Sequence, residues 1–566
     1  MRMVFTFFIL LAPYFNLHAV SQAATQPALQ DAMQQLQKGD AAAAVNLLKR
    51  FTEVDPRSAD AWRALGKAYQ QLHKDDDAIE AYQRALQIEP DAPKVFFAMG
   101  IAYAAKRDTE SAFKWFRRAR DSGRYDMTQL SIEKDVAGLR QDARFAALLP
   151  SAAQFEHPFV EPVAIVHEWR GEASNDQFGW IARNIGDVDG DGVNDVVISA
   201  PTHGSKESRA GRIYVYSTRT GKHLWHADGR AGDQLGIGVE SAGDTNNDGI
   251  PDVVASGPAG SGVAYVYSGT DGRILHSFSS NNPDELFGSH VSGAGDVNQD
   301  GFADILIGAP GKEDENKIAG HVYIYSGKDG ALLRTLDGER IGDEYGSTVA
   351  GYSDAKGQGY VVVGAPRAGA RHHGRVYVYD RISAKPKFII EADGSGMALG
   401  AMFVSVVGDI DGDGFDDIYA SDWSNSAKGL STGRIFVHSG KTGKRVLTLT
   451  GESAGDGFGT SASVAGDVDG DGHADLIVGA WQYGKTAVSG GRVYLYSGND
   501  GRLLQTYTDH IPGDTLGFDA VGVGDVDQDG DVDLLLTAAW SGVNGYHSGR
   551  VFVVSSGIQR PAKPKK

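Results

Sequence analysis

The alternation of apolar and polar positions divides the chain into two regions. Through residues 25–149 the apolar residues recur with helical spacing, whereas from residue 163 they form short runs separated by turns rich in Gly, Asp and Asn. Between the two regions, residues 150–162 contain three prolines and predict a linker. We therefore expect a multidomain chain in which an all-α array precedes an all-β domain.

A 34-residue period runs through the helical region. The seven positions Trp62, Leu65, Gly66, Tyr69, Ala78, Tyr82 and Ala85 return as Phe96, Met99, Gly100, Tyr103, Ala112, Phe116 and Ala119. This pattern resembles the tetratricopeptide repeat, a pair of antiparallel helices in which Gly and Ala let the helices approach. A weaker copy precedes it, and residues 130–149 are expected to cap the last unit. The resemblance implies a protein partner for the array of residues 25–149, although the aromatic residues themselves are expected to pack between helices.

A longer period organises the second region. Seven units each begin with an apolar residue followed by glycine, at Phe178-Gly179, Leu235-Gly236, Phe287-Gly288, Tyr345-Gly346, Leu399-Gly400, Phe458-Gly459 and Leu516-Gly517. Each unit predicts about four short strands, which is the spacing of a propeller. The pattern, most complete where Phe287-Gly288 is followed by Gly308-Ala309-Pro310, resembles the FG-GAP repeat of integrin alpha-subunit heads. The resemblance implies a seven-bladed β-propeller over residues 163–560 that binds an extracellular protein or glycan.

The two ends of the β region predict a closed ring. The last unit has a third strand near residues 549–555 but no fourth, whereas residues 163–169 supply an extra strand before the first unit. Pairing these two segments would leave no exposed strand edge at the junction.

Six units carry an aspartate-rich loop between their first two strands. Oxygen ligands are expected at positions 1, 3, 5 and 9 and from the backbone carbonyl of position 7, an arrangement that suits Ca²⁺ better than zinc or magnesium. The six predicted sites are Asp187, Asp189, Asp191, Val193 and Asp195; Asp244, Asn246, Asp248, Ile250 and Asp252; Asp296, Asn298, Asp300, Phe302 and Asp304; Asp409, Asp411, Asp413, Phe415 and Asp417; Asp467, Asp469, Asp471, His473 and Asp475; and Asp525, Asp527, Asp529, Asp531 and Asp533. We expect about six structural calcium ions.

The fourth unit has a loop of the same length without the ligands. Tyr352, Asp354, Lys356 and Tyr360 occupy positions 1, 3, 5 and 9, and Lys356 would place an ammonium group near the ion. We therefore expect no cation there.

Composition and the chain ends bear on the cellular location. The net charge of −19 argues against nucleic-acid binding, and the absence of cysteine excludes disulfides and thiolate metal sites. Residues 1–24 predict a cleaved signal peptide, and no later segment predicts a transmembrane helix. We expect a secreted, periplasmic or cell-surface protein, with residues 561–566 as a basic tail.

The loops on the propeller face opposite the aspartate loops are longer and more variable, which makes that face the expected ligand face. Trp423, Trp481 and Trp540 begin three of these loops and either bind a ligand or pack between inner strands. No His-Glu-x-x-His motif is found, so we expect a non-catalytic adhesion or scaffold protein. The alternatives are a hydrolase or other enzyme built on such a propeller, and a lectin-like module.

Overall fold

The computed structural model describes residues 26–205, 208–259, 262–311, 318–353 and 359–558. The chain divides between Glu156 and His157 into two compact units, which are described separately. The predicted signal peptide, residues 1–24, and the basic tail, residues 561–566, lie outside the described residues.

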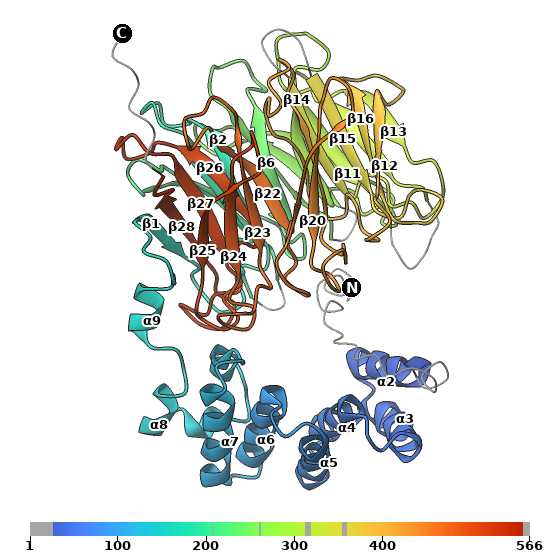
Figure 1. The fold of residues 1–566 in the computed structure, drawn as a ribbon, viewed down its shortest axis with the longest axis vertical. Helices are drawn as coiled ribbons and strands as arrows, with labels where there is room; N and C mark the ends of the chain where they lie inside the picture. The colour runs from blue at the N-terminus through green and yellow to red at the C-terminus, as the bar shows by residue number, and fades with distance from the viewer. Residues whose placement is uncertain (1–25, 206–207, 260–261, 312–317, 354–358, 559–566) are drawn as a thin grey trace. The chain divides into compact units, whose positions relative to one another are not determined.

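The first unit contains three consecutive pairs of helices (Figure 1). They are α2 Gln26–Lys38 with α3 Ala41–Val54, α4 Ala59–Gln71 with α5 Asp75–Ile88, and α6 Pro93–Ala105 with α7 Thr109–Asp121. Gly66 lies so close to the Tyr82 ring that an added Cβ would lie 2.4 Å from it, and Gly100 has the same relation to Phe116. The glycines of the 34-residue period therefore allow each helix pair to pack closely, as predicted.

The segment after α7 caps the unit with short turns rather than with a regular helix. It consists of η2 Met127–Ser131, η3 Ala137–Leu139, α8 Ala143–Ala146 and α9 Ala152–Glu156. Leu130, Val136 and Phe145 are buried in the hydrophobic cluster that contains Phe113 and Phe116 of α7. The apolar spacing of residues 130–149 thus serves packing against the last helix pair.

The second unit consists of seven four-stranded antiparallel sheets, the blades of a propeller. Blades one to four are β2 Ala182–Gly186, β3 Asp195–Ala200, β4 Arg212–Tyr216 and β5 His223–Asp228; β6 Gly238–Gly243, β7 Asp252–Gly257, β8 Val263–Tyr267 and β9 Ile274–Ser279; β10 His290–Gly295, β11 Asp304–Ala309, β12 His321–Tyr325 and β13 Leu332–Asp337; and β14 Thr348–Ser353, β15 Gly359–Ala365, β16 Arg375–Asp380 and β17 Phe388–Glu391. Blades five and six are β18 Val404–Val406, β19 Ile418–Asp422, β20 Arg434–His438 and β21 Arg445–Thr450; and β22 Ser461–Gly466, β23 Asp475–Ala480, β24 Arg492–Tyr496 and β25 Leu503–Thr508.

The seventh blade is built from both ends of the unit, which confirms the predicted closure. It contains β26 Ala520–Gly524, β27 Asp533–Ala538, β28 Arg550–Ser555 and, as its outer strand, β1 Ile165–Arg170. Strands β1 and β28 are antiparallel, with Glu168 opposite Phe552.

Residues 150–162, which were predicted as a linker, do not form an extended connection. Its first half forms α9, and its second half contacts the last two blades: Phe159 packs on Phe552, and Glu161 accepts a hydrogen bond from the Thr508 N–H (2.7 Å). Residues 159–161 therefore belong to the propeller unit.

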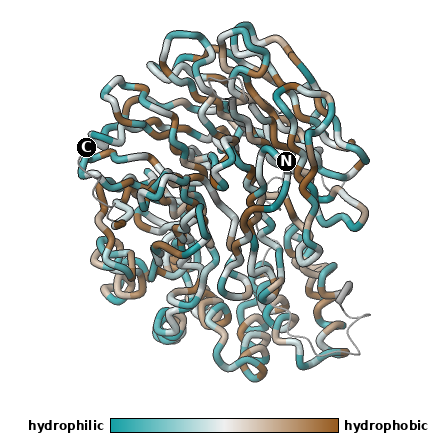
Figure 2. Tube along the Cα trace, turned by 45° about the horizontal axis from the view of Figure 1, so that its top comes forward, coloured by the Kyte–Doolittle hydropathy of each residue, from teal (hydrophilic) through white to brown (hydrophobic). Residues whose placement is uncertain are grey.

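The core of the propeller lies along the second strand of each blade. The strands β3, β7, β11, β15, β19, β23 and β27 are buried along their whole length. Figure 2 shows hydrophobic stretches, coloured brown, along the trace of the chain. Neighbouring blades are joined at their outer strands, where Trp225 Nε1 of blade one donates to the Gly269 carbonyl of blade two (2.7 Å). In this contact a side chain from the fourth strand of blade one packs on the turn between the third and fourth strands of blade two.

Candidate cation loops and ligand face

Each aspartate loop is the connection between the first and second strands of its blade. In five loops the position-9 aspartate is the first residue of the second strand, and in blade five Asp417 directly precedes β19. Because all seven blades run in the same direction around the ring, these connections lie on one face of the propeller. The turns between third and fourth strands share that face, as the hydrogen bond from Ser439 Oγ to Asp413 Oδ2 (3.1 Å) shows.

The position-9 aspartates are fully buried and hold the loops to the sheet. In blade one, Asp195 Oδ2 accepts from the Val188 N–H (2.9 Å) and Asp195 Oδ1 from the Thr218 N–H in the turn after β4 (3.3 Å). Burial raises the pKa of Asp195 and Asp475 to about 6, and that of Asp304, Asp417 and Asp533 to about 7. A nearby cation would favour the ionised form of each.

The other loop aspartates are oriented by backbone N–H groups. Asp187, at position 1, accepts from Gly190 and Asp191 through Oδ1 and from Gly192 through Oδ2. Asp189 accepts from the Asp191 N–H. Gly192 at position 6 has a φ of 85°, a conformation that favours glycine and lets the chain turn back toward the strand. Hydrogen bonds from the loop backbone thus fix the orientation of these side chains.

In four loops this arrangement brings three carboxylates together. Oxygen atoms of positions 1, 3 and 9 lie within 4.8 Å of one another in the groups Asp187, Asp189 and Asp195; Asp409, Asp411 and Asp417; Asp467, Asp469 and Asp475; and Asp525, Asp527 and Asp533. The position-5 aspartates are outside these groups, and in blades two and three position 3 is the amide Asn246 or Asn298.

The chemistry of the loops fits a hard divalent cation. In blade seven, Asp525 Oδ1 and Asp533 Oδ1 are buried and accept no hydrogen bond from any described residue. Burying a carboxylate oxygen that accepts no hydrogen bond destabilises the folded state. A bound calcium ion, which these oxygens would coordinate, removes that cost. At position 7 the side chains serve packing instead: Val193 is buried, and His473 Nδ1 lies 2.9 Å from the Ile410 carbonyl of the neighbouring blade.

The corresponding hairpin of blade four has a different register. Tyr352 lies opposite Tyr360 and Ser353 opposite Gly359, without the register shift seen in blade three between Gly293 and Gly295. Tyr360 is buried, and its hydroxyl lies 3.1 Å from where a Cβ on Gly440 of blade five would be. The buried Tyr360 at position 9 therefore replaces an aspartate with a packing group, whereas Tyr352 at position 1 is exposed. Asp354 and Lys356 lie outside the described residues.

The predicted ligand face carries an aromatic cluster made of Trp180, Trp481, Phe518, Trp540 and His547. The ring centroids of Trp481 and Trp540 are 5.1 Å apart, those of Trp180 and Phe518 4.7 Å apart, and those of Trp540 and His547 5.0 Å apart. Trp481 and Phe518 are buried, whereas Trp180 and Trp540 are half-buried. The cluster joins blades six, seven and one.

Three members of the aromatic cluster, Trp180, Phe518 and His547, were missed from the sequence. Trp180 and Phe518 directly follow the apolar-Gly pairs of units one and seven, and an aromatic residue at that position in two adjacent blades was the available signal. Trp423 occupies the same blade position as Trp481 but lies in blade five and is not part of the cluster.

A buried arginine beside the cluster joins blades across the centre of the ring. Arg183 Nε donates to Glu240 of blade two (2.8 Å), and Arg183 Nη1 donates to Asp519 of blade seven. Its guanidinium also lies 5.4 Å from the Phe403 ring centroid of blade five. Burial raises the pKa of Glu240 and of Asp519, and the positive charge of Arg183 opposes this rise.

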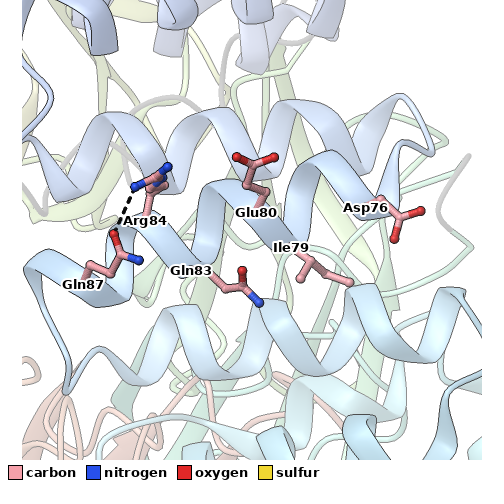
Figure 3. A pocket seen from close by; sticks show the side chains of 6 residues that line it. All are labelled: Asp76, Ile79, Glu80, Gln83, Arg84 and Gln87. Carbon is pink, nitrogen blue, oxygen red and sulfur yellow. Dashed lines mark hydrogen bonds between the residues drawn. The ribbon is translucent and has the colours of Figure 1, made fainter.

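The helical unit has a shallow groove along α5. Figure 3 shows Asp76, Ile79, Glu80, Gln83, Arg84 and Gln87 lining a groove of about 440 Å³. A second groove of about 370 Å³ shares Gln83 and Gln87 and extends to Trp115 and Arg118 of α7. Both therefore lie on the side formed by the second helices of the pairs.

Among the described residues, every helix is too short or too polar to cross a membrane.

Comparison with known protein families identifies both repeat types. The FG-GAP repeat family matches residues 178–216, 287–325 and 458–496, and a tetratricopeptide repeat family matches residues 29–93 and 69–126. Both resemblances predicted from the sequence are confirmed.

Several curated relatives are integrin alpha subunits. Integrin alpha-4 of Xenopus laevis is 30% identical over 253 residues, which cover 41% of this chain and 24% of the relative. Integrin alpha-5 of Xenopus laevis is 30% identical over 38% of this chain and 22% of the relative, and integrin alpha-PS3 of Drosophila melanogaster is 32% identical over 28% and 15%. The chain thus spans less than a quarter of the length of these relatives.

Proposed function

We propose that this chain is an exported adhesion or scaffold protein. It carries tetratricopeptide repeats followed by a seven-bladed FG-GAP propeller, which is similar to part of integrin alpha subunits. Its propeller binds an extracellular or envelope ligand, and its helical array binds a protein partner. The protein works outside the cytoplasm, in a periplasm, at the cell surface or as a secreted protein.

Calcium has a structural role in this proposal. The six aspartate loops would hold the ions through the carboxylates at positions 1, 3, 5 and 9, with Asn246 and Asn298 replacing a carboxylate at position 3. Three converging carboxylates repel one another in the empty loop, so a bound dication offsets this repulsion and fixes each loop to its sheet. The ions thereby stiffen one face of the ring and support the blades that display the opposite face.

The observation that carries the ligand proposal is the aromatic cluster on the face opposite the aspartate loops. Trp180 and Trp540 keep part of their surface exposed, while Trp481 and Phe518 are buried beneath and beside them. Indole rings held by packing offer a large contact area at a low entropic cost, and binding hot spots are enriched in tryptophan. We therefore assign ligand contact to Trp180 and Trp540, and a packing role to Trp481.

The helical array offers its own contact surface. The grooves along α5 and α7 combine the exposed polar side chains of Gln83 and Gln87 with the half-buried ring of Trp115. Arg118 lies 4.7 Å from the Trp115 ring centroid and could pair with an acidic group of a bound peptide. This is where we place the partner of the tetratricopeptide repeats.

Retention of the labelled full chain on arrays of extracellular proteins, peptides and glycans, in millimolar calcium, tests the proposal. We expect binding that is lost in Trp540→Ala and kept in Trp423→Ala, with both variants melting within a few degrees of the wild type. Equal loss of binding in both variants, or hydrolysis of an arrayed substrate, would contradict it. Selective retention of glycans would identify the propeller as a lectin-like module.

A further inference from the structure

The turns between third and fourth strands carry an uneven charge around the ring. In three blades each turn has one basic residue and one aspartate: Arg273 with Asp271, Lys328 with Asp329, and Arg502 with Asp500. The turn of blade one has two basic residues, Arg219 and Lys222, and no acidic one. The turns of blades four and five, together with the first residue of β21, contain six basic residues: Arg381, Lys385, Lys387, Lys441, Lys444 and Arg445. We call these six residues the basic patch. Asp380, the last residue of β16, is the acidic residue that precedes it in blade four.

Side-chain contacts join the two turns into one surface. The ammonium groups of Lys387 and Lys441 lie 5.8 Å and 4.8 Å from the centroid of the same ring, that of Phe415. A Cβ on Gly443 would lie 2.8 Å from the Phe388 ring, so the turn of blade five packs directly on the outer strand of blade four. The basic patch is therefore continuous across the boundary between the two blades.

The basic patch lies where the series of acidic loops is interrupted. Blade four has Tyr352 and Tyr360 at the positions that carry aspartates in the other six blades. Lys387 lies over the Tyr360 ring, 5.0 Å from its centroid, which places the basic side chains beside the altered hairpin. Positive charge thus replaces negative charge at the hairpin of blade four, whereas blade five keeps its aspartate loop, where Lys441 Nζ donates to the Asp413 carbonyl (3.2 Å).

Most of this positive charge is exposed and only partly neutralised. Lys385, Lys387, Lys441, Lys444 and Arg445 are all exposed. Lys387 pairs with Asp380 (3.3 Å), whereas Lys385 and Lys444 form no ion pair with any described residue.

We propose that the basic patch binds an acidic polysaccharide. Its charges stand on exposed turns, and its central ring, Phe415, is covered by two ammonium groups, so it lacks the open aromatic anchors of a protein interface. A linear chain with repeated sulfate or carboxylate groups can pair with several of these cations at once. This surface is distinct from the aromatic cluster, which lies on the opposite face.

Binding of the full chain to dextran sulfate, in millimolar calcium, tests the proposal, with neutral dextran as the uncharged control. The double variant Lys385→Glu with Lys444→Glu removes two exposed side chains of the patch. The matched control is Lys222→Glu with Arg273→Glu, which makes the same charge change in equivalent turns of blades one and two, where both side chains are also exposed.

We expect salt-sensitive binding of dextran sulfate that weakens by at least about tenfold in the patch variant and by less than about twofold in the control. Melting temperatures of both variants should match that of the wild type, which would exclude unfolding as the cause. Equal weakening in both variants would overturn the proposal, since net charge alone would then explain binding. Tighter binding to polyglutamate or to vesicles of anionic phospholipid would also overturn it, in favour of a protein or a membrane.

Discussion

Trp169 Nε1 of blade seven donates a hydrogen bond to the Gly221 carbonyl of blade one, 2.9 Å away. Trp169 lies on β1, the strand that closes the ring, and its ring also stacks on Tyr216 of blade one with centroids 4.8 Å apart. One side chain therefore joins the two blades that lie farthest apart in the sequence.

Replacing this side chain should open the junction. We expect Trp169→Ala to lower the free energy of unfolding of the propeller by about 3–5 kcal/mol, because it removes a buried aromatic ring and its hydrogen bond. Urea unfolding followed by tryptophan fluorescence measures the change. Ile165→Ala, in the exposed start of the same strand, is the control and should cost less than about 1 kcal/mol. Similar costs for both would mean that β1 contributes little to closure.

Calcium should stabilise the propeller. An ion that binds only the folded loops stabilises by mass action, about 2.7 kcal/mol per site when its concentration is 100 times its dissociation constant. We expect the melting temperature of the propeller to rise in millimolar calcium and to fall after chelation, with a smaller effect of magnesium. Identical melting curves with calcium and with chelator would refute a structural metal.

The number of ions should be six. Blade four has Tyr352 and Tyr360 in place of two ligands, so calcium titration by isothermal calorimetry should saturate at six ions per chain. Asp525→Asn should reduce the count by one and leave the other sites intact. An anomalous signal in the hairpin of blade four would show that this interpretation of the hairpin is wrong.

The helical array should depend on its glycines. Gly66→Ala places a Cβ within 2.4 Å of the Tyr82 ring, so we expect a loss of about 1–3 kcal/mol in the stability of the array. Gly138→Ala is the matched control, because no atom lies within 4 Å of the added carbon. Thermal melting followed by circular dichroism at a helix-sensitive wavelength distinguishes them. Equal stability of the two variants would contradict the close approach of α4 and α5.

Removing the central arginine should produce a pH-dependent loss of stability. Arg183→Met leaves the buried Asp519 and the half-buried Glu240 without their cation, at a cost of about 3–5 kcal/mol at pH 7. Burial raises the pKa of both carboxyl groups in the folded state above that in the unfolded chain, so this cost is absent when both are protonated and grows as the pH rises.

The difference in unfolding free energy between Arg183→Met and the wild type should therefore be smaller at pH 5 than at pH 7. Adding Glu240→Gln and Asp519→Asn to the variant should remove most of the pH dependence. A difference that stays constant with pH would show that Arg183 acts through packing alone.

Features that repeat along the chain could be predicted from the sequence. The Gly66 and Gly100 period, the seven apolar-Gly pairs and the spacing of the loop aspartates each recur in register, so every copy supports the assignment of the others. The outer strand near Trp169 could be placed because the last unit lacked it. The position-9 aspartates could be located from the sequence. Their hydrogen bonds to turns distant in the sequence could not be predicted.

Features that occur once could not be predicted, because they depend on contacts across the ring. Arg183 meets Glu240 and Asp519 only after blades one, two and seven are assembled. Local periodicity carries no record of such a meeting, in contrast to Phe518, whose place directly after an apolar-Gly pair was a signal in the sequence. Residues 130–149 differ for a local reason: their apolar residues match helical spacing while packing as short turns.

The pairing of β1 with β28 has a consequence for the time course of folding. Glu168 meets Phe552 only after almost the entire β region has left the ribosome, so the seventh blade is the last that can form during synthesis. Contacts between distant residues carry a large loop-closure cost and slow folding. Until then β1 has no partner strand in its own chain, and it can pair instead with β28 of another copy. Strand exchange between copies is thus the misassembly to which this ring is most exposed, and it becomes more frequent as the concentration of newly made chains rises.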